Sequence, residues 1–222
     1  TLHMQKVVKV ITTSTLLTIC AIYFPAIASA APTKKPTPVI CKPTTAKAHT
    51  VKNITPPVVK PPFKNKIFTF MTNCGDIVIQ ANGKSAPITV TALAALANGG
   101  FYNKTFCHRL VTDEIYVLQC GDPTGTGMGG PNFSYRDENL PQAVQTNYPA
   151  GTVAMANSGA NTNGSQFFIV FQDTSMNPNY TIWGRVTKGL EIVRAIAKEG
   201  VADGSTDGMP KQIIAIERVR VR

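Results

Sequence analysis

Few side chains in this sequence are of the kinds that attack a substrate or hold a metal ion. The chain of 222 residues has 3 histidines, and only His108 lies in the part with a globular composition. It has no cysteine or serine partner at a spacing that indicates nucleophilic catalysis. A lone histidine of this kind is typical of a hydrogen-bonded structural residue. None of the 5 cysteines belongs to a CxxC pair, so we expect no zinc site.

Two loops have the composition of ligand-binding motifs but lack the essential residues of those motifs. The glycine-rich segment 125–130 has neither the Lys-Ser/Thr pair of a phosphate loop nor its strand-to-helix frame. The segment 203–208, Asp-Gly-Ser-Thr-Asp-Gly, lacks the alternating ligands and the closing Glu of an EF-hand loop. We interpret the first as a turn and the second as a solvated loop, and we expect no metal or other cofactor.

Two longer strings combine polar side chains with apolar strands. In the first, Phe-Cys-His-Arg-Leu-Val contains Arg109, and Gln119 follows ten residues later in Tyr-Val-Leu-Gln-Cys-Gly-Asp. In the second, a polar loop enters an apolar strand through Asn-Thr-Asn-Gly-Ser-Gln-Phe-Phe-Ile, residues 161–169. Taken singly, these residues have ordinary interpretations: Phe168 as core, Gln119 as a partner of backbone groups and Arg109 as a member of a salt bridge.

Taken together and in this order, the two strings resemble the cyclophilin family of peptidyl-prolyl isomerases. The resemblance covers residues 67–222. It implies a mainly β fold, a closed eight-stranded antiparallel barrel capped by two helices. It also implies that the chain isomerises peptide bonds before proline in other polypeptides, without a cofactor or metal.

The resemblance further implies which residues form the site. Arg109 occupies the position of the central catalytic arginine, Tyr116 that of an aromatic residue of the proline pocket, and Gln119 that of the motif glutamine. The substrate-binding positions of the family correspond to Val117, Ala156, Asn157, Gln166, Phe168, Ser175, Met176 and Tyr180.

The sequence departs from the best-known family pattern at several of these positions. Many cyclophilins have Phe where Tyr116 stands, Trp at Ser175, Leu at Met176 and His at Tyr180. The connection between Arg109 and Tyr116 is also two residues longer. The substituted pocket keeps open an alternative function, a non-catalytic module that binds proline-containing peptides.

The pattern of apolar residues agrees with a β-rich domain. Residues 67–72 and 76–80 have strand composition and flank an Asn-Cys-Gly turn, which predicts a hairpin. Pro87 begins a helical pattern that ends at Asn98-Gly-Gly, and residues 189–197 repeat such a pattern. Further strands are expected at residues 105–111, 115–119, 152–156, 166–170, 181–186 and 212–221.

The N-terminal third has a different character. Residues 1–30 combine Lys6 and Lys9, an apolar stretch and Ala-Ser-Ala, which is typical of a cleaved export signal, with an uncleaved membrane anchor as the alternative. Residues 31–66 contain eight prolines, eight lysines and no acid. We expect a disordered linker there. It serves as a spacer, or it attaches the protein to the cell wall or an anionic membrane surface.

Charge and cysteine content add two expectations. Residues 67–222 carry twelve basic and twelve acidic side chains, so the net charge of +10 belongs to the leader and linker and does not indicate nucleic-acid binding. We expect a monomer. In an exported protein Cys41, Cys74, Cys107 and Cys120 allow three pairings, among which the sequence does not choose. The family fold brings the strands near Cys107 and Cys120 together, so we hypothesise a disulfide between them, with two buried thiols as the alternative.

Overall fold

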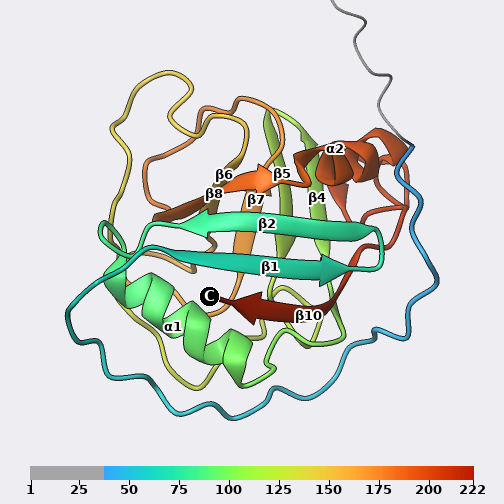
Figure 1. The fold of residues 1–222 in the computed structure, drawn as a ribbon. Coiled ribbons are helices and arrows are strands. Elements are labelled where there is room, and N and C mark those ends of the chain that lie inside the picture. Colours follow the sequence, from blue (N-terminus) through green and yellow to red (C-terminus); the bar gives the residue numbers. More distant parts are fainter. Residues whose placement is uncertain (1–37) are drawn as a thin grey trace, which may run out of the picture. The chain divides into compact units, whose positions relative to one another are not determined.

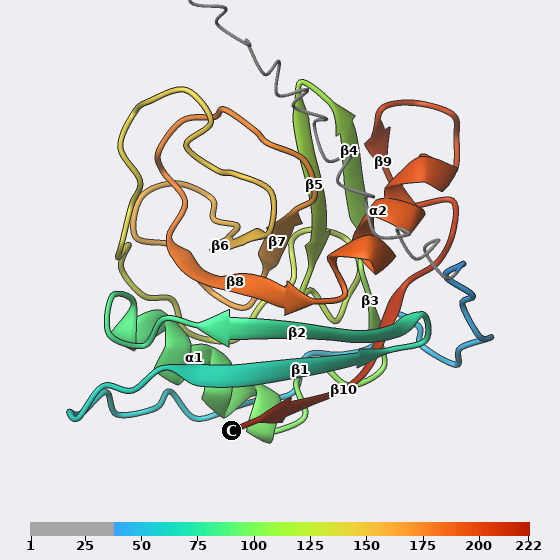
Figure 2. The same cartoon turned by 45° about the horizontal axis from the view of Figure 1, so that its top comes forward.

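The computed structural model describes residues 38–222. The expected signal segment, residues 1–30, and residues 31–37 of the expected linker lie outside the described residues. Figures 1 and 2 show the described part in two orientations.

One antiparallel sheet of ten strands forms the body of this part of the chain (Figure 1). In sheet order the strands are β3 (Thr105–Phe106), β10 (Ala215–Val221), β1 (Lys66–Thr72), β2 (Gly75–Ala81), β8 (Ile182–Lys188), β6 (Thr152–Met155), β7 (Phe167–Val170), β5 (Ile115–Cys120), β4 (Arg109–Asp113) and β9 (Asp207–Gly208). The predicted hairpin is the β1–β2 pair, in which Thr72 lies opposite Gly75.

The closed barrel of eight strands is not confirmed, because the sheet is a curled half-barrel with two free ends (Figure 2). We expected residues 105–111 to form one strand. They divide at Cys107 and His108 into β3, which pairs with β10, and β4, which pairs with β5. The loop after the second helix adds β9 beside β4. β3 and β9 therefore end the sheet and do not pair with each other.

Two helices complete the fold, near the predicted positions. α1 (Pro87–Asn98) begins with a proline, whose missing N–H costs nothing at a helix start. Its free N–H groups at Ile88 and Thr89 donate to the carboxylate of Glu138, at 3.1 and 2.9 Å. α2 (Leu190–Glu199) turns its apolar face inward. Within residues 38–222 neither helix is long and apolar enough to span a membrane.

The buried apolar residues fall into two clusters on opposite faces of the sheet. The larger one fills the curl and contains packed aromatic rings, among them Phe68, Phe167 and Trp183, together with the inner faces of α1 and α2. The smaller one lies on the outer face of β4 to β7 and includes Val117 and Phe168. Strand alternation sends neighbouring residues of one strand to different clusters.

Residues 38–65 form a strap along the domain, which corrects the expectation of a disordered linker. The strap has neither helix nor strand, yet Cys41 is joined to Cys74 by a disulfide. The backbone N–H groups of Lys42 and His49 donate to carbonyls of the domain, at 2.8 and 2.9 Å. Ile54 packs against the core near Gly99. Figure 1 shows the strap passing α1 before it enters β1. Scattered apolar residues of the strap pack against the surface of the domain, and the composition of the strap alone does not predict this contact.

Candidate active site

The β4–β5 hairpin fixes the placement of the two motif side chains. Its ladder is regular: Arg109 lies opposite Gln119, and Asp113 lies opposite Ile115, with Glu114 alone at the turn. Glu114 adopts a positive φ of 60°, which closes the hairpin without a bulge. Because side chains alternate along a strand, Arg109 and Gln119 project from the same face of the hairpin.

The guanidinium of Arg109 is held by two partners. Its Nε and Nη2 donate to the two carboxylate oxygens of Asp207, at 2.7 and 2.6 Å, and its Nη1 donates to Oε1 of Gln119 at 3.4 Å. The hydrogen bond to Asp207 raises the pKa of Arg109, and the same bond lowers the pKa of Asp207. Both groups are therefore ionised at neutral pH.

A chain of amide groups extends from Arg109 into the glycine-rich loop. Nε2 of Gln119 donates to Oε1 of Gln166 at 2.8 Å, and Nε2 of Gln166 donates to the carbonyls of Gly127 and Gly129 at 2.9 and 2.8 Å. With its amide nitrogen committed to Gln166, Gln119 has its oxygen left to face Arg109. The network thus fixes the orientation of both glutamine side chains.

The glycine-rich loop folds around the buried carboxylate of Asp122. This carboxylate accepts hydrogen bonds from the backbone N–H groups of Thr124, Gly127 and Gly129, at 2.7, 2.7 and 3.1 Å. Burial disfavours the charge, but these hydrogen bonds and that of the Thr124 hydroxyl outweigh it and hold the pKa of Asp122 below its ordinary value. The loop is the turn that we predicted, and it presents carbonyls to the site.

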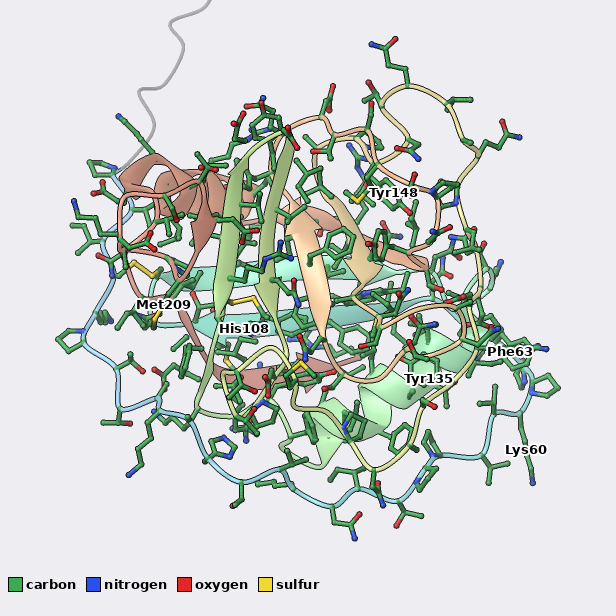
Figure 3. All side chains as sticks on the ribbon, turned by 180° about the vertical axis from the view of Figure 1, so that it is seen from behind. Lys60, Phe63, His108, Tyr135, Tyr148 and Met209 are labelled. Atoms are coloured by element: carbon green, nitrogen blue, oxygen red, sulfur yellow. A yellow bond between two sulfur atoms is a disulfide. The ribbon has the colours of Figure 1, made fainter. Side chains whose placement is uncertain are left out.

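A small pocket opens beside Arg109 on the outer face of the sheet. Its volume is about 150 Å³. It is lined by Arg109, Ile115, Val117, Gln119, Ala156, Asn157, Phe168, Met176 and Tyr180. Phe168 forms the floor and meets the ring of Tyr180 edge to face, with centroids 5.4 Å apart. Figure 3 looks onto this face, with β4, β5 and β7 in front. One cation and two amides thus border an otherwise largely apolar hollow.

The family model of the cyclophilin type peptidyl-prolyl cis-trans isomerases (Cyclophilin type peptidyl-prolyl cis-trans isomerase/CLD) matches residues 67–221. The chain belongs to this family. The match covers the ten strands and both helices, except for Lys66, the first residue of β1. The whole strap, residues 38–65, lies outside the matched residues.

Similar proteins bear related names. The chain is 43% identical to the probable peptidyl-prolyl cis-trans isomerase B of Mycobacterium leprae and 41% identical to that of Mycobacterium tuberculosis, over 73% and 68% of its length. It spans only 62% and 53% of those relatives. Its fold is similar to the crystal structure of a Cryptosporidium parvum cyclophilin, with a TM-score of 0.63, 28% identity, and coverage of 72% of this chain and 98% of that one.

The structure brings most of the sequence-predicted site residues of this cyclophilin together. Arg109, Val117, Gln119, Ala156, Asn157, Phe168, Met176 and Tyr180 all line the one pocket. Gln166 stands behind Gln119 and borders an adjoining hollow of about 230 Å³. The side chain of Asn157 donates to the carbonyl of Asn179 at 2.8 Å, which braces the pocket wall.

Besides Gln166, two further predicted residues do not line the pocket. Tyr116 projects from the opposite face of β5, where its ring meets that of Phe171 with centroids 6.0 Å apart. The regular β4–β5 ladder requires this, because Tyr116 is separated from Gln119 by an odd number of positions. Ser175 is exposed, and its hydroxyl accepts a hydrogen bond from the N–H of Thr146 at 2.8 Å.

Sequence reasoning missed two residues of the site. Ile115 lines the pocket where the aromatic residue was expected, and strict alternation back from Gln119 identifies it. Asp207 lies in the segment that we interpreted as a solvated loop, yet it binds Arg109 through both oxygens. No local signal indicates this contact, since the two residues are 98 positions apart.

His108 lies under the glycine-rich loop and outside the pocket (Figure 3). Both of its ring nitrogens are buried without a hydrogen-bond partner among residues 38–222. His108 is therefore a partly buried structural residue, and the side chain of Gln166 lies beside its ring. Burial lowers the pKa of His108; the charge of Asp122 opposes this effect and that of Arg109 reinforces it. The ring is neutral at physiological pH.

A disulfide joins Cys107 to Cys120 on the inner side of the hairpin. Cys107 precedes Arg109 by two residues, and Cys120 directly follows Gln119. Both sulfurs belong to the core cluster inside the curl. The disulfide therefore covalently ties together the two chain segments that carry the motif side chains.

Proposed function

We propose that the chain catalyses cis/trans isomerisation of peptide bonds that precede proline. The observation that carries the proposal is a guanidinium, fixed on two sides, at the rim of a hollow of about 150 Å³ whose walls include Phe168, Met176 and Tyr180. Pockets for drug-sized ligands measure roughly 300–1,000 Å³, so this one suits a single small ring. The names of the similar proteins support the same activity, and one related crystal structure was determined in the presence of the dipeptide Ala-Pro.

The reaction requires no nucleophile. Rotation about a prolyl amide is slow because the nitrogen lone pair is conjugated with the carbonyl group, which gives a barrier of about 18–20 kcal/mol. No covalent bond breaks. A catalyst must only bind the twisted amide more tightly than either planar form. In the twisted form the nitrogen lone pair is released from conjugation and becomes a hydrogen-bond acceptor.

The pocket residues divide this work. Phe168, Met176 and Tyr180 bury the pyrrolidine ring of the proline. These apolar contacts hold the ring equally well in the planar and the twisted amide. Arg109 donates to the prolyl nitrogen as its lone pair leaves conjugation. An arginine suits this role because it stays charged and its donors are coplanar. Gln119 and the backbone near Asn157 hold the flanking peptide while the bond rotates.

The test compares isomerisation of a short Ala-Pro peptide by the full chain and by Arg109→Ala. We expect the wild type to accelerate exchange well above background. The variant should lose about 100- to 1,000-fold in kcat/KM, the usual loss when one donor to a transition state is removed. Arg220→Ala, which removes an exposed arginine on β10, is the matched control and should retain full activity.

The same experiment distinguishes the alternative function, a non-catalytic module that binds proline-containing peptides. If a folded wild-type chain fails to accelerate exchange, the catalytic proposal is wrong. Peptide-induced NMR shifts confined to the pocket residues would then support the binding module. Equal activity of wild type and Arg109→Ala would contradict the arginine-assisted mechanism while leaving the isomerase activity in place.

We further propose that the protein works outside the cytoplasmic membrane on exported polypeptides. The signal-like sequence of residues 1–30 supports this, as do the disulfides Cys41–Cys74 and Cys107–Cys120, since disulfides persist in oxidising compartments. Cell fractionation with thiol labelling is the test. Four free thiols in protein recovered from the producing cell would contradict the proposal.

The strap offers a basic surface for attachment to an anionic envelope component. Its side chains at Lys42, Lys47, Lys52, Lys60 and Lys64 are exposed, and residues 38–65 contain no acid. Lys60 lies at the edge of the molecule in Figure 3. We expect salt-sensitive co-sedimentation of the chain with anionic vesicles. Replacing these lysines by glutamine should abolish it; unchanged sedimentation would leave the strap as a spacer.

A further inference from the structure

The loop between α2 and β10 presents one carboxylate to the site. Residues 201–211 are tied across their base, where the N–H of Ala202 donates to the carbonyl of Met209 at 2.8 Å and that of Lys211 to the carbonyl of Gly200 at 2.9 Å. Met209 marks this loop in Figure 3. Inside it, the Ser205 hydroxyl donates to Asp203 at 2.6 Å. The loop is exposed, but its backbone is well defined by its own hydrogen bonds.

The edge of the sheet sets the position of Asp207 within this loop. β9 pairs with β4 so that Val111 lies opposite Asp207, and the N–H of Thr112 donates to the carbonyl of Thr206 at 2.9 Å. Side chains of diagonal partners in an antiparallel pair lie on the same face and within reach of each other. The side chain of Asp207 therefore lies on the same face as that of Arg109, which is two residues along β4 from Val111.

We propose that Asp207 is a positioning residue for isomerisation, which holds the guanidinium of Arg109 in the plane and direction required at the prolyl nitrogen. The inference rests on the proposed function and adds a residue to its machinery. The carboxylate contacts Nε and Nη2, the two donors on one edge of the fork, and leaves Nη1 on the side of Gln119.

The two-oxygen contact is what makes this role specific. A single hydrogen bond leaves a guanidinium free to rotate about its donor, whereas two parallel bonds fix its plane. Half of each side chain remains exposed, 42% for Arg109 and 48% for Asp207, so the pair contributes little to overall stability. Its effect should fall on the orientation of a group that acts only when the amide twists.

The expected result for Asp207→Ala in the full chain is a loss of about tenfold in kcat/KM with the Ala-Pro peptide, mainly in kcat, because the lost order affects the twisted amide more than the planar one. Asp207→Glu should recover most of this loss, since its carboxylate again offers two oxygens. Asp207→Asn offers one acceptor oxygen and should recover little. In an Arg109→Ala background, Asp207→Ala should have no further effect.

Asp76→Ala is the matched control, because it removes an exposed carboxylate on β2 that takes no part in the loop or in the contacts of Arg109. It should stay within about twofold of the wild type. The NMR signal of the Arg109 Nε–H group provides a readout besides activity: it should exchange slowly with water in the wild type and in Asp207→Glu, and rapidly in Asp207→Ala.

The outcomes separate this inference from the function on which it rests. An active wild type with an equally active or faster Asp207→Ala variant overturns the role of Asp207 alone, as does an equal loss in Asp76→Ala. An additive loss in the Arg109→Ala background also overturns it. A folded wild type that does not accelerate isomerisation overturns both the function and the inference.

Discussion

The two faces of β5 have different tasks, although their residues alternate along six positions of one strand. Ile115, Val117 and Gln119 face outward and line the pocket beside Arg109. Leu118 and Cys120 face inward and belong to the core inside the curl. Tyr116, on that same inward side, borders a shallow hollow of about 570 Å³ between the hairpin and α2.

The comparison of the two faces shows that the volume of a hollow does not identify the functional site. The hollow at Tyr116 has nearly four times the volume of the pocket, yet it is wide open and borders no chain of linked polar groups. The pocket is small, has a buried floor at Phe168 and is bordered by the network from Asp207 through Arg109 and Gln119 to Gln166. What separates the faces is which one receives fixed polar groups around an apolar cavity.

The largest expected effects come from substitutions at two adjacent positions of β5, one of which should lower activity and the other stability. Gln119→Ala should lower kcat/KM by about one to two orders of magnitude with little change in stability, because it removes the link between Arg109 and Gln166. Leu118→Ala should lower the free energy of unfolding by about 2–5 kcal/mol and leave the activity of the folded fraction intact. Denaturant unfolding and peptide isomerisation together test this. Parallel changes in both variants would show that the two faces are not separate.

The disulfide on the inward side should contribute to stability and not to chemistry. The double variant Cys107→Ser/Cys120→Ser should lose about 3 kcal/mol in the free energy of unfolding, the chain-entropy value for a loop of 13 residues. Its kcat/KM, measured where it is folded, should stay within about threefold of the wild type. Reductant opens Cys41–Cys74 as well as Cys107–Cys120, so the reduced wild type should be destabilised by at least as much as the double variant measured without reductant. An unfolding curve that does not respond to reductant would contradict the prediction.

Substitutions at Ile115 and Tyr116 test which of the two side chains lines the pocket. The structure places Ile115 there, whereas the family pattern predicts Tyr116. Ile115→Ala enlarges the pocket and should lower kcat/KM about fivefold, largely by raising KM, since it removes an apolar contact with the ring. Tyr116→Ala should leave kcat/KM within about twofold. The opposite ranking in the peptide assay would place Tyr116 in the pocket and contradict the regular hairpin register.

The smallest expected effect is on the pH dependence of stability, through His108. Burial lowers its pKa in the folded state, so the unfolded chain takes up a proton first as the pH falls below about 6.5. Stability contributed by the neutral ring is complete above that pH and declines as the pH falls toward the folded pKa, by about 1.4 kcal/mol per pKa unit. Thermal unfolding between pH 7.5 and 5 should show this decline in the wild type and a smaller one in His108→Gln. Identical slopes would contradict it.

Much of the fold could be predicted because its elements are locally encoded. The turn at Asn73-Cys74-Gly75, the proline that begins α1 and the Asn-Gly-Gly sequence that ends it each fix a boundary within a few residues. The division of residues 105–113 between β3 and β4 could not be predicted in this way. It depends on which distant strands accept their hydrogen bonds, β10 for one and β5 for the other.

The contacts of the strap with the domain could not be predicted from its local sequence either. Residues 38–65 contain neither helix nor strand, because prolines supply few N–H donors and the segment has no periodic apolar face. The composition of the strap gave no indication that Cys41 pairs with Cys74 or that Ile54 packs against the domain. Docking of an irregular segment depends on the surface it meets, which is assembled from residues remote in sequence.

The motif side chains and the family that they indicate could be identified from the sequence alone, because Arg109, Gln119, Gln166 and Phe168 belong to long, specific motifs. Which side of β5 faces the pocket depends on the fold, because a shift of one residue in the hairpin register moves every side chain of the strand to the other face. The tertiary structure alone also placed Asp207, 98 positions away, against the guanidinium of Arg109. Contacts of that kind arise from strand pairing at the sheet edge and leave no local trace in composition or spacing.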